Sequence, residues 1–191
     1  GLVAVLPQGQ GLGLHGGLGA EGLGLQLAAA LLDVLDHVRV LDGGVAVFDG
    51  SQGVEPQSET VWRQADKYKV PRIAFVNKMD KTGADFYMSL DSIAERLTKN
   101  AAAIQLPIGF ESSFSGIVDL IEMKAYEFEG AHGEKIIEKE IPSDLAEKAK
   151  EYREKLIEKV AESDEQFMEK YLGGEDFTKE DLKAAIRRAV I

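Results

Sequence analysis

The sequence contains no cysteine among its 191 residues. Disulfide bonds and thiolate metal sites are therefore excluded, and a reducing, cytoplasmic location is expected. A long apolar run is also lacking, because the stretch from Leu25 to Leu35 is shorter than the ~20 residues that cross a bilayer and is interrupted by Gln26 and Asp33. The N-terminus lacks the basic start of a signal peptide. We therefore expect a soluble protein that does not associate with a membrane.

The sequence has fewer basic than acidic side chains. The chain has 33 acidic and 22 basic side chains, which gives a formal net charge of -11. Because phosphate backbones are bound mainly by Lys and Arg, this balance disfavours DNA binding and any broad contact with RNA. A contact with RNA is expected to be local, or to pass through a basic partner protein. The length and the apolar fraction of 45% allow one domain with a sizeable insertion.

Residues 1–37 have no Lys or Arg and consist largely of Gly and Leu. They show no period of two or of 3.6, and only the stretch from Leu25 to Asp36 predicts a helix. The glycines suggest a phosphate loop, but no Gly-Lys-Ser or Gly-Lys-Thr follows to bind phosphate and magnesium. We predict a glycine- and leucine-rich leader of uncertain structure. A sheet that has this leader in place of a regular first strand should expose an edge or an apolar patch, which favours self-association.

From Val38 onward the sequence alternates between strand and helix patterns. Strands are predicted over 45–48, 70–76 and 102–109, and helices over 56–69 and 86–97. The first of these strands is an uninterrupted apolar run, the pattern of a strand buried on both faces. Strand, helix, strand, helix, strand predicts an α/β fold with a parallel sheet over residues 38–109.

After Gly109 this alternation ends. The stretches 114–130 and 134–142 predict short antiparallel strands, and charged helices follow. A helix after Pro142 is expected to bury one stripe of side chains: Leu145, Ala149, Tyr152, Leu156 and Val160. Ser163 with Gln166, and Thr178 with Asp181, have the spacing of capping boxes that begin two later helices. Residues 110–191 are therefore predicted to form an acidic α+β subdomain.

The residues with the clearest chemistry are Asn77, Lys78, Met79 and Asp80, directly after a predicted buried strand. Ligands of parallel sheets bind beyond the carboxyl ends of the strands. The two oxygens of Asp80 can accept from the adjacent N1 and N2 donors of guanine, which adenine does not present. Asn77 can bond another edge of the base, and the Lys78 stem can lie on the ring. An ordinary Asn-Lys turn with a solvent-facing Asp gives the same four residues, so both interpretations stay open at this point.

The stretch VRVLDGGVAVFDGSQGVEPQSETVWRQADKYKVPRIAFVNKMDKTGADF resembles elongation factor G almost residue for residue, and the resemblance continues to Ile191. Residues 1–37 do not match. The resemblance implies a partial P-loop-GTPase-type parallel sheet with an α+β insertion subdomain at 110–191. It also implies a translational GTPase that binds GTP or GDP with Mg²⁺, engages the ribosome and couples hydrolysis to movement of tRNA and mRNA. Asn77, Lys78 and Asp80 match its guanine-binding residues, and residues 49–56 match a loop that we interpret as mainly structural.

Several family features have no counterpart in this sequence. The phosphate loop, the magnesium-binding threonine and the Asp-x-x-Gly-His that supplies the catalytic histidine are absent, and His37 lies too close to the matching region to replace it. We therefore predict no catalytic and no metal-binding residue, and weak or absent nucleotide binding by this chain alone. Three alternatives remain: a GTPase segment whose N-terminal part is missing or miswritten, a module that docks a ribosomal protein through its acidic insertion, and a non-functional fragment.

Overall fold

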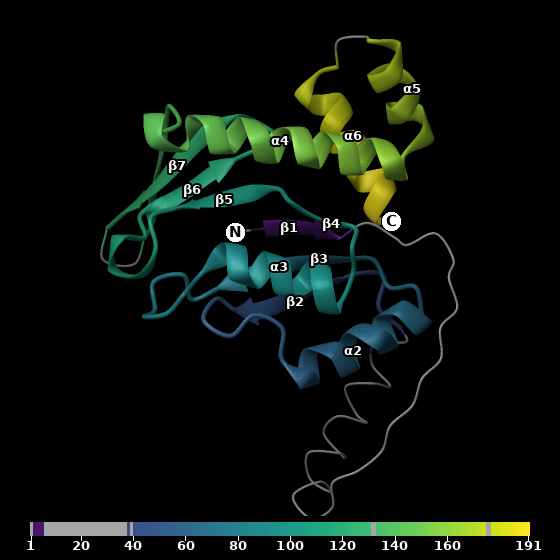
Figure 1. Ribbon diagram of the computed structural model, residues 1–191, viewed down its shortest axis with the longest axis horizontal. Coiled ribbons are helices and arrows are strands. Elements are labelled where there is room, and N and C mark those ends of the chain that lie inside the picture. The colour runs from purple at the N-terminus through teal and green to yellow at the C-terminus, as the bar shows by residue number, and fades with distance from the viewer. Residues whose placement is uncertain (1, 6–37, 39, 131–132, 175–176) are drawn as a thin grey trace, which may run out of the picture.

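The computed structural model describes residues 2–5, 38, 40–130, 133–174 and 177–191 (Figure 1). The predicted helix over 25–36 lies outside these residues, as does His37. The described strands are β1 (Leu2–Val5), β2 (Gly44–Asp49), β3 (Arg72–Asn77), β4 (Ala101–Ala103), β5 (Gln105–Ile108), β6 (Gly116–Asp119), β7 (Lys124–Glu129) and β8 (Lys135–Lys139). The α-helices are α2 (Pro56–Lys67), α3 (Phe86–Arg96), α4 (Ser143–Ser163), α5 (Glu165–Gly173) and α6 (Lys179–Val190), and a short 3-10 helix covers Glu111–Ser113.

The first sheet has the strand order β2-β3-β1-β4. Strands β2 and β3 are parallel, and their register places Asp49 opposite Asn77. The predicted α/β class with parallel pairing is confirmed. Strand β1, which the sequence did not predict, runs antiparallel to both of its neighbours, with Val3 opposite Ala74 in β3 and Ala103 in β4. The first sheet is therefore mixed.

Strand β1 lies in the leader, for which we predicted no strand. The Leu-Val-Ala-Val segment at 2–5 lies between two strands of the body, and Val3 is fully buried. The apolar run from Leu2 to Leu6 leads directly into the glycine-rich sequence, and we interpreted it as part of that leader. Its pairing partners lie about seventy to a hundred residues further along the chain, so only the assembled sheet identifies it as a strand.

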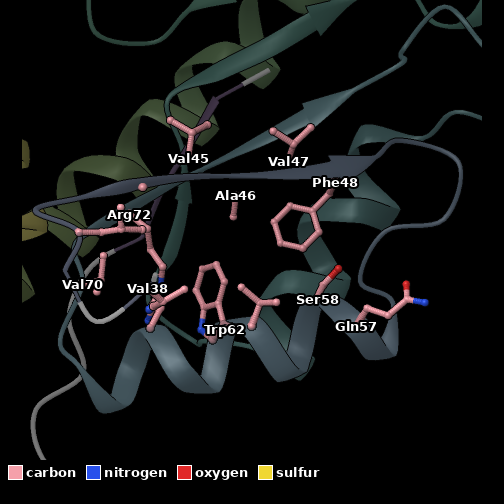
Figure 2. Close-up of a pocket in the computed structure, with 14 residues that line it drawn as sticks. Val38, Val45, Ala46, Val47, Phe48, Gln57, Ser58, Trp62, Val70 and Arg72 are labelled. Carbon is pink, nitrogen blue, oxygen red and sulfur yellow. The ribbon is translucent and has the colours of Figure 1, made fainter. Parts of the chain in front are cut away.

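Strand β2 lies at an edge of the first sheet and is buried on one face only. Val45 is 65% exposed and Val47 is 59% exposed, whereas Phe48 is 3% exposed. Figure 2 shows Val45 and Val47 on one side of the strand, and Ala46 and Phe48 on the side that faces α2. The prediction of burial on both faces was wrong, because an apolar run does not reveal whether a second layer covers it. Among the described residues, no strand pairs with the outer edge of β2, and Val45 and Val47 form an apolar patch on its uncovered face.

Helices α2 and α3 follow the sequence pattern closely. Pro56 occupies the first turn of α2, where its missing N–H costs no hydrogen bond, and α2 buries Trp62 and Ala65. Asp85 caps α3 by accepting hydrogen bonds from the backbone N–H groups of Tyr87 and Met88, at 2.8 and 3.0 Å. Each helix ends within two residues of its predicted end.

The second sheet is antiparallel throughout, with the order β5-β6-β7-β8. This arrangement confirms the antiparallel strands predicted after Gly109. The single strand predicted over 102–109 is in fact two strands, because the chain leaves the first sheet after Ala103 and enters the second at Gln105. The change of sheet at Ile104 therefore precedes the boundary that we predicted after Gly109.

Helix α4 lies along the second sheet in Figure 1, with α5 and α6 at its C-terminal end. It buries Ala149, Leu156 and Val160, and Leu145 and Tyr152 pack against the same core while remaining partly exposed. The predicted stripe is thus confirmed. One apolar core spans both sheets, and its fully buried large side chains include Val3, Val76, Phe86, Ile93, Leu106, Val118, Leu120, Leu156, Val160, Phe167 and Leu182.

The two predicted capping boxes had different outcomes. Thr178 caps α6, and its reciprocal bonds with Asp181 form the predicted box. Ser163 is instead the last residue of α4, and the neighbouring Asp164 caps α5 by accepting from Phe167 N at 2.8 Å. Asp164 also accepts two hydrogen bonds from the Arg188 guanidinium, at 2.7 and 2.9 Å. These bonds lower the pKa of Asp164 and connect α6 to the α4–α5 junction.

No helix within the described ranges is both long and apolar enough to cross a bilayer.

Candidate functional site

The predicted tetrapeptide lies at the carboxyl end of β3. Asn77 is the last residue of that strand, and Lys78, Met79 and Asp80 continue into a turn. The parallel neighbour β2 ends at Asp49, directly opposite Asn77. Two parallel strands therefore end side by side at this loop, the usual position of a ligand site in an α/β sheet.

An ion pair with Asp49 holds the Lys78 side chain. Lys78 Nζ lies 2.5 Å from Asp49 Oδ2, while Asp49 Oδ1 accepts from the Ser51 backbone N–H at 3.0 Å and from the Ser51 hydroxyl at 2.7 Å. The hydrogen bonds from Lys78 and Ser51 hold the pKa of Asp49 well below its usual range, and the bond to Asp49 raises the pKa of Lys78. The Lys78 stem is thereby placed across the ends of β2 and β3.

The backbone of the loop is fixed by bonds to other segments. Gly50 N donates to Asn77 O at 2.8 Å, and Glu111 N donates to Met79 O at 2.9 Å. Met79 is 4% exposed, so it anchors the loop in the core. A Cβ on Gly50 would lie 2.9 Å from Asn77 O and from Met79 Sδ, so only glycine allows β2 and this loop to approach so closely.

Lys78 itself has a φ of 59°, in the left-handed region that residues other than Gly, Asn and Asp rarely adopt. Such a conformation persists where the surrounding contacts hold it, and it is frequent at ligand sites. Here the contacts are the Asp49 ion pair on one side and the buried Met79 on the other.

Three polar side chains of the loop are exposed: Asn77, Lys78 and Asp80. Within the part of the chain that the structure describes, neither the Asp80 carboxylate nor the Asn77 amide has a hydrogen-bonding or ionic partner. Lys78 is held by Asp49, whereas Asp80 and Asn77 present unused hydrogen-bonding groups to solvent. The loop therefore combines a fixed aliphatic stem with a carboxylate that can accept two bonds.

Sequence reasoning missed two residues that shape this loop. Asp49 was interpreted as part of a structural loop, yet it is the partner of Lys78. Glu111 accepts from the Gly83 backbone N–H at 2.6 Å and so links the segment after Asp80 to the connection between β5 and β6. The sequence shows Asp49 as the first charged residue after the β2 apolar run, but its pairing with Lys78 follows from the strand register that only the structure shows. No comparable signal in the sequence indicates Glu111.

The residues present suit one part of a guanine nucleotide better than the rest. Asp80 and Asn77 provide acceptors and donors for a purine base. For phosphates and Mg²⁺, the sequence has no Gly-Lys-Ser or Gly-Lys-Thr, and the described residues include no group of three His, Asp or Glu side chains placed to hold a metal.

Comparison with known proteins agrees with this geometry. The family described as "Elongation factor Tu GTP binding domain" matches residues 32–176, a stretch that includes the loop after β3, the whole second sheet, α4 and α5. A crystal structure of a protein from Thermus thermophilus has a TM-score of 0.69 and 28% sequence identity to this chain. The match covers 82% of this chain but only 24% of that protein. The chain therefore belongs to the translational GTPases that carry the elongation factor Tu GTP binding domain.

Proposed function

We propose that this chain carries the guanine-reading loop of a ribosomal translocation factor, a cytoplasmic GTPase that couples GTP binding and hydrolysis to movement of tRNA and mRNA during elongation. The observation that supports this most directly is the exposed Asp80 carboxylate, which has no partner among the described residues, follows a parallel strand and lies two residues from the fixed Lys78. Membership of the family makes the ribosome the expected partner.

In the proposed complex, Asp80 accepts hydrogen bonds from guanine N1–H and from the exocyclic amino group. Charged acceptors make hydrogen bonds of about 1.5–3 kcal/mol each, so Asp80 should dominate the choice of base. The aliphatic stem of Lys78 covers one ring face, because the ion pair with Asp49 restrains it across the strand ends. Asn77 bonds a further edge of the base and helps to order the loop.

We further propose that this chain alone does not hydrolyse GTP. Phosphoryl transfer needs a lysine for the phosphates, a bound magnesium ion and a positioned water. The sequence contains no phosphate-loop lysine and no Asp-x-x-Gly-His. Binding of the base and hydrolysis are thus separable in this polypeptide, and GDP should gain little affinity from its phosphates.

A docking role for the acidic insertion, residues 110–191, is the second candidate. Its net acidic character favours a basic ribosomal protein as partner. Many of its carboxylates, however, already have partners within the unit. Glu122 accepts hydrogen bonds from Lys179, with Nζ 2.7 Å from Oε2, and from Lys183. These two bonds lower the pKa of Glu122 to about 2. Glu127 and Glu138 pair with lysines across β7 and β8. This internal pairing leaves base recognition as the better-supported function.

The first prediction tests the base reader with ¹H–¹⁵N NMR titrations of the whole chain. Guanosine should shift the amide signals around Asn77 and Asp80 with a dissociation constant of about 1 mM, which corresponds to about -4 kcal/mol. Asp80→Asn should weaken guanosine binding about 10–100-fold and improve xanthosine binding, because an amide offers one acceptor and one donor. GDP should bind the wild-type chain no more than about tenfold tighter than guanosine, since few phosphate contacts are available.

Asp91→Asn is the matched control, because Asp91 is an exposed aspartate on α3 outside the loop. It should leave the preference for guanosine unchanged. If Asp80→Asn still preferred guanosine over xanthosine, Asp80 would not read the base. A micromolar affinity for GDP would show that some other segment of the chain binds the phosphates.

A further inference from the structure

Glu111 holds the turn that carries Asp80 at both of its ends. The Glu111 backbone N–H donates to Met79 O at 2.9 Å, and the Glu111 carboxylate accepts from the Gly83 backbone N–H at 2.6 Å. Asp80 lies between these two points of attachment and is itself exposed. A single residue from a distant segment therefore restrains the chain on either side of the candidate base reader.

The contact joins two segments with an unusual backbone conformation. Glu111 has a φ of 50°, and Lys78, which precedes Met79, has a φ of 59°. These are two of the four residues other than glycine that have a positive φ among the described residues. Such conformations persist only where the surrounding contacts impose them, and they gather at ligand sites. The contact between Glu111 and the turn is thus maintained against the ordinary backbone preference of both segments.

The connection between β5 and β6 gives this contact a firm support. It contains the short 3-10 helix that begins at Glu111. The Ser113 hydroxyl donates to Phe110 O at 2.7 Å and accepts from Phe110 N at 3.1 Å, and Ser115 N donates to Ile108 O at 2.9 Å. These bonds close the connection on itself at the end of the second sheet. Glu111 therefore reaches the turn from a segment that is held independently of the turn.

We propose that Glu111 is a positioning residue for base recognition, which orders the turn so that both Asp80 oxygens are in place before guanine binds. This role rests on the proposed function of Asp80. A loop that occupies its binding conformation for only part of the time binds its ligand more weakly by that fraction, so a restraint at both ends of the turn raises affinity without touching the base. Through Glu111, the insertion takes part in reading the base.

The second prediction compares GMP with IMP in ¹H–¹⁵N NMR titrations of the whole chain. Hypoxanthine, the base of IMP, lacks the exocyclic amino group of guanine, so the ratio of the two affinities reports whether Asp80 uses both oxygens. The wild-type chain should prefer GMP at least about fivefold. Glu111→Ala should weaken GMP binding about 3–10-fold and reduce the preference to below about twofold, because the turn loses its bond at Gly83. Glu111→Gln keeps a side-chain acceptor and should restore most of both.

Glu111→Gly separates positioning from stability. Glycine adopts a φ of 50° without strain, so this variant should unfold at no lower urea concentration than Glu111→Ala, yet it should lose GMP affinity to the same extent. Without ligand, both variants should raise the solvent-exchange rate of the Gly83 amide at least about threefold, because its acceptor is gone. Glu129→Ala is the matched control, because it removes an exposed glutamate of the second sheet that pairs with Lys135 at 3.1 Å, away from the turn. It should leave the exchange rate and both affinities unchanged.

The outcomes distinguish this role from the proposed function. If Glu111→Gly bound GMP as tightly as the wild type and with the same preference over IMP, Glu111 would not position Asp80, although the proposed function would stand. If the wild-type chain bound neither nucleotide, or bound IMP as tightly as GMP, the proposed function would fail and the positioning role with it.

Discussion

At the scale of single residues, the sequence predicted the exposed groups of the candidate site but not the groups that hold them. Asn77, Lys78 and Asp80 form a recognisable pattern, and their place after an apolar run put them at a strand end. Asp49 could not be found in the same way, because its pairing with Lys78 depends on the alignment of two strands and joins residues 29 positions apart. Local motifs are visible in a sequence, whereas their supports depend on the assembled sheet.

The third prediction concerns the pH dependence of the Asp49–Lys78 pair. The folded-state pKa of Asp49 lies below its unfolded value of about 4, so the pair stabilises the fold above that pH and loses its effect as pH falls toward the folded pKa. Asp49→Asn should therefore be less stable than the wild type near neutral pH, and the difference should shrink below about pH 4. Urea unfolding monitored by Trp62 fluorescence measures it.

Lys78→Met removes the other partner of the same pair and serves as the cross-check. The stability lost in the double variant should be smaller than the sum of the two single losses, because both changes remove one interaction. A difference between wild type and Asp49→Asn that stayed constant from neutral to acidic pH would show that the ion pair contributes nothing measurable.

At the scale of elements, the features that depend on local sequence were predicted best. The bounds of α2 and α3 follow from Pro56, the Asp85 cap and the apolar spacing. The change of sheet at Ile104 was missed, because a continuous stretch of β-forming residues does not reveal that its two halves pair with different strands. Strand β1 was missed for the same reason. Its partners lie about seventy to a hundred residues further along the chain, so its pairing cannot be inferred from local sequence.

The fourth prediction tests whether β1 belongs to the sheet in solution. Val3 is fully buried between β3 and β4, so Val3→Ala removes two methyl groups from the core and should lower the free energy of unfolding by about 1.5–3 kcal/mol. Val45→Ala makes the same chemical change in the same sheet at a position that is 65% exposed, and it should change stability by less than about 0.5 kcal/mol. Chemical denaturation of both variants provides the comparison. Equal effects would mean that residues 2–5 do not form a central strand.

At the scale of the whole molecule, the two sheets differ in how their edges are protected. The outer strand of the second sheet, β8, carries Lys135, Glu138 and Lys139, which disfavour pairing with another chain. The outer strand of the first sheet, β2, has no charged residue before Asp49 and exposes Val45 and Val47. An exposed apolar edge strand is a template for β-pairing, so of these two edge strands β8 is protected by charge and β2 is not.

The fifth prediction is that the chain self-associates by pairing β2 with a second copy of β2. This pairing is favourable because it satisfies backbone groups at the exposed edge and buries Val45 and Val47. Sedimentation velocity should show that the apparent mass rises with protein concentration over the micromolar range. The double variant Val45→Lys, Val47→Lys should be monomeric, because lysines that face one another across the strand pair repel. Ile136→Lys is the matched control, because Ile136 is 64% exposed on the other edge strand, and it should leave association unchanged. Association that survived the double variant, or that Ile136→Lys abolished, would place the contact elsewhere. A wild-type chain that stayed monomeric at all concentrations would show that the β2 edge does not pair.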